Sequence, residues 1–226
     1  MTAATYWIGI GDIHDAVSAV SRLAEQPDLA GAAGLIISGD LTLRGGEPQA
    51  RRVIEAARRL GKPLLAQIGN MDQPTVDAYL SEEGINIHAA GRVTPEGVGI
   101  FGVGWSSPTP FATPSEADED QIAAWLATAR VAVAGCEKLL LVCHTPPYDT
   151  AVDMVASGAH VGSRAVRAYI ERVQPDVCLT GHIHEARAVD TIGRTVVVNP
   201  GPLSAGGYAR IILDETGGLT AKLASL

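Results

Sequence analysis

Short apolar runs alternate with longer amphipathic stretches through the first half of the chain. Three apolar runs have the length of buried strands: residues 6–10, 35–38 and 64–68. Three stretches repeat apolar positions with helical spacing: residues 17–26, 48–60 and 74–81. Strand, helix and strand in repeated succession predict right-handed βαβ units and a largely parallel, buried sheet.

The second half of the chain is richer in turn-forming residues, but it too is predicted to contain both strands and helices. It predicts strands at residues 92–93, 99–103, 139–143 and 176–180, with hairpins at 186–198 and 208–223. Ser115 is followed three residues later by Asp118, which favours a helix from Ser115 to about residue 133. Residues 162–173 are also helical in pattern. Because no linker or repeat interrupts the chain, we predict a single α/β domain over residues 1–226.

Composition narrows the functional classes. The chain has 17 Lys and Arg against 25 Asp and Glu, a net charge of −8, which argues against nucleic acid as a partner. The longest apolar run, residues 139–143, is far shorter than the roughly 20 residues of a membrane helix, which predicts no membrane span. The three cysteines form no C-x-x-C pair and the start of the chain shows no signal peptide, so we expect a cytoplasmic protein.

Polar residues cluster where the predicted strands end. Four of the six histidines lie in these segments, which should converge at one edge because ligands bind beyond the carboxyl ends of parallel strands. The candidate residues are Asp12, His14, Asp40, Asn70, His144, His182 and His184.

Two carboxylates, one amide oxygen and four imidazoles form a hard-to-borderline donor set that suits Mn, Fe, Zn or Ni. Seven donors are too many for one ion but fit two, if one carboxylate bridges them. Two ions about 3.5–4 Å apart would clamp a phosphate and supply a bridging hydroxide as the nucleophile.

The order of these motifs resembles the calcineurin-like metallophosphoesterases, whose signature runs D-x-H, G-D, G-N, H and G-H-x-H. The resemblance extends from Asp12 to His184 and on to residues 199–202. It implies a four-layer α/β/β/α sandwich, with two mixed sheets flanked by helices. It also implies two divalent metal ions, with Mn²⁺ expected first. One ion would be held by Asp12, His14, Asp40 and His184, and Asp40 would bridge to a second held by Asn70, His144 and His182.

Met71 stands where many members of this family carry a histidine that contacts the phosphate and protonates the leaving oxygen. A thioether cannot donate a proton, and general acid catalysis typically contributes about 10²–10⁴-fold. The loss of general acid catalysis slows hydrolysis most when the leaving group has a high pKa. Small bacterial and archaeal phosphodiesterases of this superfamily also lack that histidine, so the sequence favours a phosphodiester substrate. The next residue, Asp72, is expected to cap the helix that starts near Pro74.

Another group could replace the missing acid or phosphate contact. His160 could donate a proton, and the helix start at Gly162, Ser163 and Arg164 could bind the substrate through free N–H groups. Asn70, a predicted metal ligand, is also expected to contact the substrate. In the alternative interpretation, Ser163 only caps the helix and His160 is a surface residue. His144, a predicted metal ligand, would also stabilise charge in the transition state and is therefore counted as catalytic.

The proline-rich loop from Trp105 to Pro114 is predicted to be a substrate wall or lid, the alternative being a cover over the core with Phe111 tucked inside. The sequence therefore predicts a metal-dependent hydrolase of a small phosphodiester. The alternatives are a phosphomonoesterase or nucleotidase, and a non-catalytic interaction module of the same fold. The oligomeric state stays open, a homodimer included.

Overall fold

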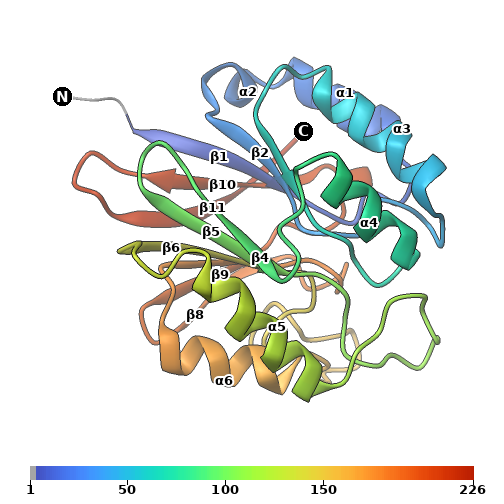
Figure 1. Cartoon of the computed structure of the whole chain (residues 1–226), viewed down its shortest axis with the longest axis vertical. Coiled ribbons are helices and arrows are strands. Elements are labelled where there is room, and N and C mark those ends of the chain that lie inside the picture. Colours follow the sequence, from blue (N-terminus) through green and yellow to red (C-terminus); the bar gives the residue numbers. More distant parts are fainter. Residues whose placement is uncertain (1–3) are drawn as a thin grey trace.

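Two β-sheets pack face to face in the computed structural model, which describes residues 4–226 (Figure 1). The first sheet has the strand order β11-β10-β1-β2-β3. Its strands are β1 (Thr5–Ile10), β2 (Gly34–Ile37), β3 (Leu64–Ala66), β10 (Gly207–Leu213) and β11 (Leu219–Ser225). The strands β1, β2 and β3 run parallel, and the hairpin β10–β11 adds an antiparallel edge beside β1.

The second sheet has the order β4-β5-β6-β7-β9-β8. Its strands are β4 (Ala90–Val93), β5 (Val98–Val103), β6 (Lys138–Cys143), β7 (Val177–Leu179), β8 (Ala188–Ile192) and β9 (Thr195–Asn199). The four central strands are parallel, and β4 and β8 close the two edges in antiparallel orientation. Both sheets are therefore mixed, with parallel strands where the site lies.

Helices cover the outer face of each sheet (Figure 1). The first sheet carries α1 (Val17–Arg22), α2 (Pro27–Gly31), α3 (Glu47–Arg58) and α4 (Pro74–Glu82). The second carries α5 (Glu119–Val131) and α6 (Arg164–Val173). Two short 3₁₀ helices, η1 (Leu23–Glu25) and η2 (Leu203–Ala205), complete the elements. The result is the four-layer α/β/β/α sandwich that the resemblance implied, and the predicted fold class is confirmed.

Strand alternation divides the apolar side chains among the layers. Ile8 and Ile10 of β1 pack under the helices of the first sheet, whereas Trp7 points into the space between the sheets. In β6, Leu141 faces the helices of the second sheet and Leu140 faces the first sheet. Successive residues of a strand point to opposite faces, and each large side chain buried this way contributes about 1.5–3 kcal/mol. Apolar runs that alternate between two cores explain why these strands read as continuously hydrophobic.

Two local expectations differ from the structure. Helix α5 begins at Glu119 with Asp118 as its N-cap, so the expected start at Ser115 is wrong. The sequence pattern does not predict the short helix α2, which begins at Pro27, a favourable first helical position. Across residues 4–226, none of the helices combines the length and the apolar character needed to cross a membrane. The single domain over residues 1–226 stays a prediction.

Candidate metal centre

The loops that follow five parallel strands meet at one edge of the sandwich. They come from β1, β2 and β3 of the first sheet and from β6 and β7 of the second. Four of the predicted site residues in these loops have left-handed backbone conformations, with φ between 47° and 69°: Asp12, His14, Asp40 and His182. Non-glycine residues rarely adopt this region, and such strain clusters at functional sites.

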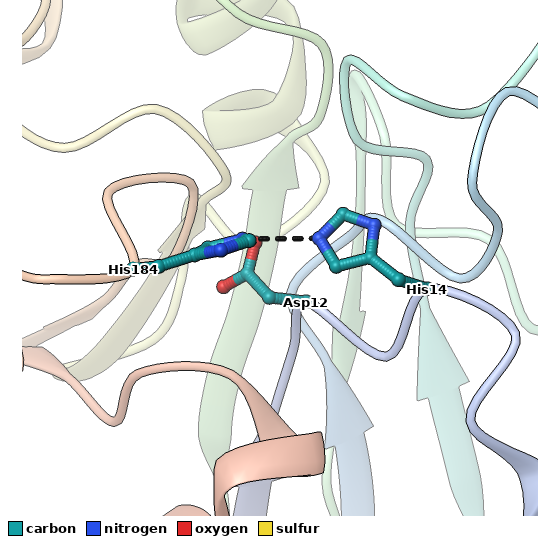
Figure 2. Close-up of side chains that lie close together, drawn as sticks. All are labelled: Asp12, His14 and His184. Atoms are coloured by element: carbon teal, nitrogen blue, oxygen red, sulfur yellow. Dashed lines mark hydrogen bonds and ion pairs between the residues drawn. The ribbon is translucent and has the colours of Figure 1, made fainter.

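Three side chains form the first group of candidate metal ligands: Asp12, His14 and His184. Figure 2 shows the rings of His14 and His184 turned toward each other beside the Asp12 carboxylate. Their Nε2 atoms lie 3.0 Å apart, and His184 Nε2 lies 3.5 Å from Asp12 Oδ1. The two histidines come from different sheets, so the group exists only where the sheets meet.

The second group lies around Asp40, which is almost fully buried. Asp40 Oδ1 lies 3.3 Å from His144 Nε2, while Asp40 Oδ2 faces the first group at 3.7 Å from His14 Nε2. Asn70 Oδ1 completes the group, 3.0 Å from His144 Nε2 and 2.7 Å from His182 Nδ1. Asp12 also lies within reach of Asp40 and His144. All seven predicted residues are therefore gathered in one place, with two carboxylates at the middle.

Burial and charge act on these residues in opposite directions. Burial disfavours ionisation of Asp12, but the neighbouring histidines outweigh it and lower its pKa to about 2. Burial would lower the pKa of His144, yet the charge of Asp40 raises it to about 9. Burial and the nearby His144 lower the pKa of His182 to about 4. At pH 7 Asp12 is thus ionised and His182 neutral, the forms that bind cations. His144 is protonated beside Asp40 and would release its proton on binding a cation.

Two glycines allow the ligand loops to approach closely. A Cβ atom on Gly39 would lie 2.5 Å from His144 Nδ1, and one on Gly181 would lie 2.6 Å from Asp12 Oδ2. Gly39 also has a φ of 131°, a conformation that favours glycine. The glycine that precedes a polar residue in these motifs therefore has a spatial reason, because a side chain there would collide with the opposite loop.

Asp72 is a site residue whose predicted role is wrong. It does not cap α4, whose N-cap is Gln73. Its fully buried carboxylate instead accepts hydrogen bonds from the backbone N–H groups of Leu41 (3.1 Å), Thr42 (2.7 Å) and Gly69 (2.9 Å), and from the Thr42 hydroxyl. Asp72 thereby joins the loops that carry Asp40 and Asn70.

Asn199 holds the loops of the second sheet in a similar way. Its side-chain amide donates to the carbonyl oxygens of Ile183 (2.9 Å) and Val152 (3.4 Å), and its Oδ1 accepts from the Gly201 N–H (2.9 Å). Ile183 lies between the two histidines of the last motif. The Asn-Pro-Gly-Pro segment at residues 199–202 thus supports the loop that carries His182 and His184.

The donor set fits divalent cations. The ligand atoms of Asp12, His14 and His184 lie within 4.8 Å of one another, and so do those of Asp12, Asp40 and His144. All of them are imidazole nitrogens or carboxylate oxygens. Two histidine nitrogens that face each other at 3.0 Å cannot both be occupied by protons, and a shared cation would use both lone pairs. Such N and O donors suit Mn, Fe, Zn or Ni.

His160 contacts residues of its own loop rather than this cluster. Its Nδ1 lies 2.7 Å from Asp153 Oδ1, its Nε2 lies 3.8 Å from Asp149 Oδ1, and its ring packs against Tyr148. The hydrogen bond with Asp153 raises the pKa of His160. A protonated His160 is thus favoured, but its role as the proton donor stays a prediction.

The N–H groups expected to be free at the start of α6 are occupied. The carboxylate of Glu119 accepts from the Arg164 N–H (3.2 Å), the Ala165 N–H (2.8 Å) and the Ser163 hydroxyl (2.6 Å). The Gly162 N–H donates to Asp153 Oδ2 (2.9 Å). The expectation of free donors at Gly162, Ser163 and Arg164 is therefore wrong, since acidic side chains of the chain itself already fill this position. The predicted capping by Ser163 is confirmed, because its hydroxyl accepts from Val166.

The sequence predicts that the loop from Trp105 to Pro114 is a substrate wall or lid, or else a cover over the core, and the structure shows features of both. Trp105 is half-buried and packs against Trp125 and His88, with ring centroids 5.4 Å and 6.4 Å away. Phe111 is 74% exposed, so it is not tucked into the core. The Arg44 guanidinium donates to the Phe111 carbonyl (3.0 Å) and ties this loop to the one after β2. The base of the loop thus covers the core, and its tip stands out beside the site loops.

The fold is thus an α/β sandwich of two mixed sheets, with carboxylates and imidazoles that could hold a metal gathered at the ends of parallel strands. Residues 8–186 match the family model of the calcineurin-like phosphoesterases, and the chain belongs to this family. The resemblance stated from the sequence is confirmed. Family membership implies divalent metal ions and supports the hydrolysis of phosphoric esters.

An uncharacterized protein of Methanocaldococcus jannaschii, MJ1162, is 34% identical over 221 residues, which cover 93% of this chain and 96% of that protein. Solved structures share the fold at lower identity. The protein TT1561 of Thermus thermophilus has a TM-score of 0.74 at 15% identity, with 99% of both chains covered. A dimetal phosphatase from Danio rerio has a TM-score of 0.69 at 10% identity, also with 99% of both covered. An archaeal phosphodiesterase has a TM-score of 0.53 at 16% identity, covering 98% of this chain and 100% of that one.

Proposed function

We propose that this protein is a phosphodiesterase that uses two divalent metal ions. The observation that carries the proposal is the position of Asp40. Its Oδ1 faces His144 and its Oδ2 faces His14, so one carboxylate reaches both groups of candidate ligands. The remaining carboxylate and imidazole candidates are the Asp12 carboxylate, the imidazoles of His14 and His184 on the side of Asp40 Oδ2, and those of His144 and His182 on the side of Asp40 Oδ1. Together with Asp40 they are more ligands than one ion needs.

We assign the ligands from this geometry. Asp12, His14 and His184 would hold one ion, and Asn70, His144 and His182 the other, with Asp40 shared. We propose Mn²⁺ first, with Fe, Zn or Ni as alternatives that the same donors accept. When bound, two such ions supply Lewis acidity toward the phosphate and an activated water as nucleophile.

The residues of the chain account for the preference for a diester. Met71 follows the ligand Asn70, and its backbone N–H donates to Asp40 Oδ1 at 2.8 Å. Its thioether offers no proton to a leaving oxygen. Without a proton donor, hydrolysis slows most when the leaving group is a simple alkoxide of high pKa. A phosphodiester or an activated ester should be slowed less. His160 or solvent would supply the proton where one is needed.

Relatives of this fold support the reaction class without deciding the substrate. One similar structure is a dimetal phosphatase and another is a phosphodiesterase. We further propose a small phosphoester substrate and a cytoplasmic location, because the chain is acidic and its three cysteines are unpaired.

The test compares two synthetic substrates with the same leaving group. We expect metal-loaded protein to hydrolyse bis-p-nitrophenyl phosphate faster than p-nitrophenyl phosphate. Asp40→Ala and His182→Ala should each lose more than the roughly 10²–10³-fold that removal of one oxyanion donor costs. Faster turnover of the monoester would replace the proposal with a phosphomonoesterase. Unchanged diester turnover in both variants would refute the metal mechanism, and a protein that binds no metal would be an interaction module.

The substitution Met71→His tests the reason for the preference. An imidazole at this position would restore a proton donor, and we expect the monoester-to-diester rate ratio to rise about 10²-fold, the low end of general acid catalysis. Met71→Leu is the matched control because it keeps an apolar side chain of similar volume. An equal ratio in both variants would show that the missing histidine does not set the preference.

A further inference from the structure

Asn70 has two chemically different ends, and only one of them can bind a cation. The carbonyl oxygen Oδ1 carries lone pairs, whereas the Nδ2 group carries two protons and no free lone pair. In the structure Oδ1 faces His144 and His182, and Nδ2 lies 3.0 Å from the hydroxyl oxygen of Thr113. Whatever holds Nδ2 therefore decides whether the amide offers oxygen or nitrogen to the centre.

The Thr113 hydroxyl holds Nδ2 because its own proton is engaged elsewhere. Thr113 Oγ1 lies 2.6 Å from Glu116 Oε1, a distance typical of a strong hydrogen bond to a carboxylate. An ionised carboxylate only accepts, so the single hydroxyl proton of Thr113 points to Glu116. Toward Asn70 the hydroxyl oxygen can then only accept. The order of donors runs from Asn70 through Thr113 to Glu116.

Glu116 is well suited to fix this direction. Its Oε1 also accepts from the Thr113 N–H (2.8 Å) and the Thr109 hydroxyl (2.7 Å). Burial opposes ionisation, but these hydrogen bonds outweigh it and lower the pKa of Glu116 to about 2. The backbone on both sides is anchored as well, since the Ser115 N–H donates to the Asn70 carbonyl at 3.0 Å.

We propose that Thr113 and Glu116 are positioning residues that orient the Asn70 amide so that its oxygen faces the metal centre. This inference rests on the proposed function, because it concerns one of the two ion sites assigned there. It gives the loop after β5 a role that neither a lid nor a cover over the core describes. Neither residue belongs to the motifs that identify the family.

The test measures metal binding rather than activity. Full-length protein is freed of metal with a chelator and titrated with Mn²⁺ by calorimetry, which gives the number of ions and an affinity for each. We expect Thr113→Val, which keeps the side-chain shape but removes the hydroxyl, to weaken one of the two sites by about 10–100-fold. Asn70→Ala identifies that site, because it should affect the same ion more strongly.

Two further variants separate orientation from general loop order. Thr113→Ser keeps the hydroxyl and should bind both ions as the wild-type protein does. Thr109→Val removes a hydrogen bond to the same oxygen of Glu116, and Thr109 has no hydrogen bond to Asn70. It should also leave both affinities within about twofold of wild type, well below the roughly 10–100-fold loss expected for Thr113→Val. Glu116→Gln should weaken Mn²⁺ binding at the Asn70 site, but by less than Thr113→Val does. The reason is that the glutamine amide can turn its own donor toward Thr113.

The outcomes distinguish the two proposals. Wild-type affinities in Thr113→Val, equal weakening of both sites, or an equal loss in Thr109→Val would each overturn the orienting role and leave the two-metal proposal standing. A wild-type protein that binds fewer than two Mn²⁺ ions would overturn the two-metal proposal, and the orienting role with it.

Discussion

The two sheets bring different chemistry to the same centre. The loops of the first sheet supply Asp12, Asp40 and Asn70 with a single imidazole, His14. The loops of the second sheet supply imidazoles alone: His144, His182 and His184. Neither sheet has a complete set of candidate ligands. The centre is therefore a property of the packing between the sheets, and the His182 N–H that donates to Asp12 crosses that junction.

The sheets also differ in how they hold their loops. A buried carboxylate, Asp72, ties the loops of the first sheet through three backbone N–H groups and one hydroxyl. A neutral amide, Asn199, ties those of the second sheet. Burial and the charge of Asp40 raise the pKa of Asp72 to about 7, so above that pH its hydrogen bonds are charged. Charged hydrogen bonds are stronger than neutral ones, and losing them leaves buried donors unsatisfied. The first sheet should therefore suffer more from the loss of its support.

Asp72→Ala should produce the largest loss of stability. Three buried N–H groups lose their acceptor, whereas the Thr42 hydroxyl can still donate to the Gly45 carbonyl at 3.0 Å, so we expect the free energy of unfolding to fall by about 3 kcal/mol or more. Urea denaturation of metal-free protein is the appropriate measurement, because bound metal would add stability by mass action. Asp72→Asn keeps one acceptor oxygen and should lose less. A loss under about 1 kcal/mol in Asp72→Ala, within the range of a single hydrogen bond, would mean that water replaces the carboxylate.

Asn199→Ala should cost less, about 1–2 kcal/mol, because neutral hydrogen bonds contribute less to stability. The Ile183 and Val152 carbonyl groups lose a donor, and the loop of His182 and His184 loosens. The same urea series measures this variant beside Asp72→Ala. If Asn199→Ala cost as much as Asp72→Ala, the contrast between a charged and a neutral support would be wrong.

The smallest effect concerns the segment 144–163, which is longer than any loop that carries candidate ligands in the first sheet. Within this segment, the hydrogen bond between His160 and Asp153 raises the pKa of His160. Burial opposes ionisation of Asp153, but the bond to His160 outweighs it and the pKa of Asp153 is lowered. The histidine contribution to stability is full below its unfolded pKa of 6.5 and is lost as pH rises through the raised value. The Asp153 contribution is present above 3.8 and is lost as pH falls through the lowered value.

His160→Gln should therefore lower the melting temperature most at about pH 5–6, between the ordinary pKa values of Asp and His, and least at about pH 9. Thermal unfolding of both proteins across this range measures the difference. A gap that does not change with pH would show that His160 acts by packing alone, for example against Tyr148.

The sequence predicts the strands and the site residues better than the supports around them. Apolar runs and the glycine-polar motifs that follow them are local patterns, and the structure brings all seven predicted residues together. Local spacing favours Ser115 and Asp72 as helix caps, and at both positions that prediction is wrong. In the structure the Ser115 hydroxyl donates to the Asp72 carbonyl at 2.7 Å, and the Asp72 carboxylate binds distant loops.

Long-range partners also explain the error at α6. Glu119 is 45 residues before Arg164 in the chain, and no local pattern indicates that its carboxylate fills the start of that helix. The orientation of Asn70 by Thr113 spans 43 residues and is equally invisible to spacing. A side chain whose partner lies in another loop can be placed only after the fold is known.

The left-handed backbone at Asp12, His14, Asp40 and His182 has a consequence for how this chain can change. Each such residue costs of order 1–3 kcal/mol, which the rest of the fold must offset. Glycine would relax the backbone at these four positions while deleting the donor atom, so the chain could become sturdier as it becomes inert. Selection for stability alone would therefore favour the loss of these donor atoms.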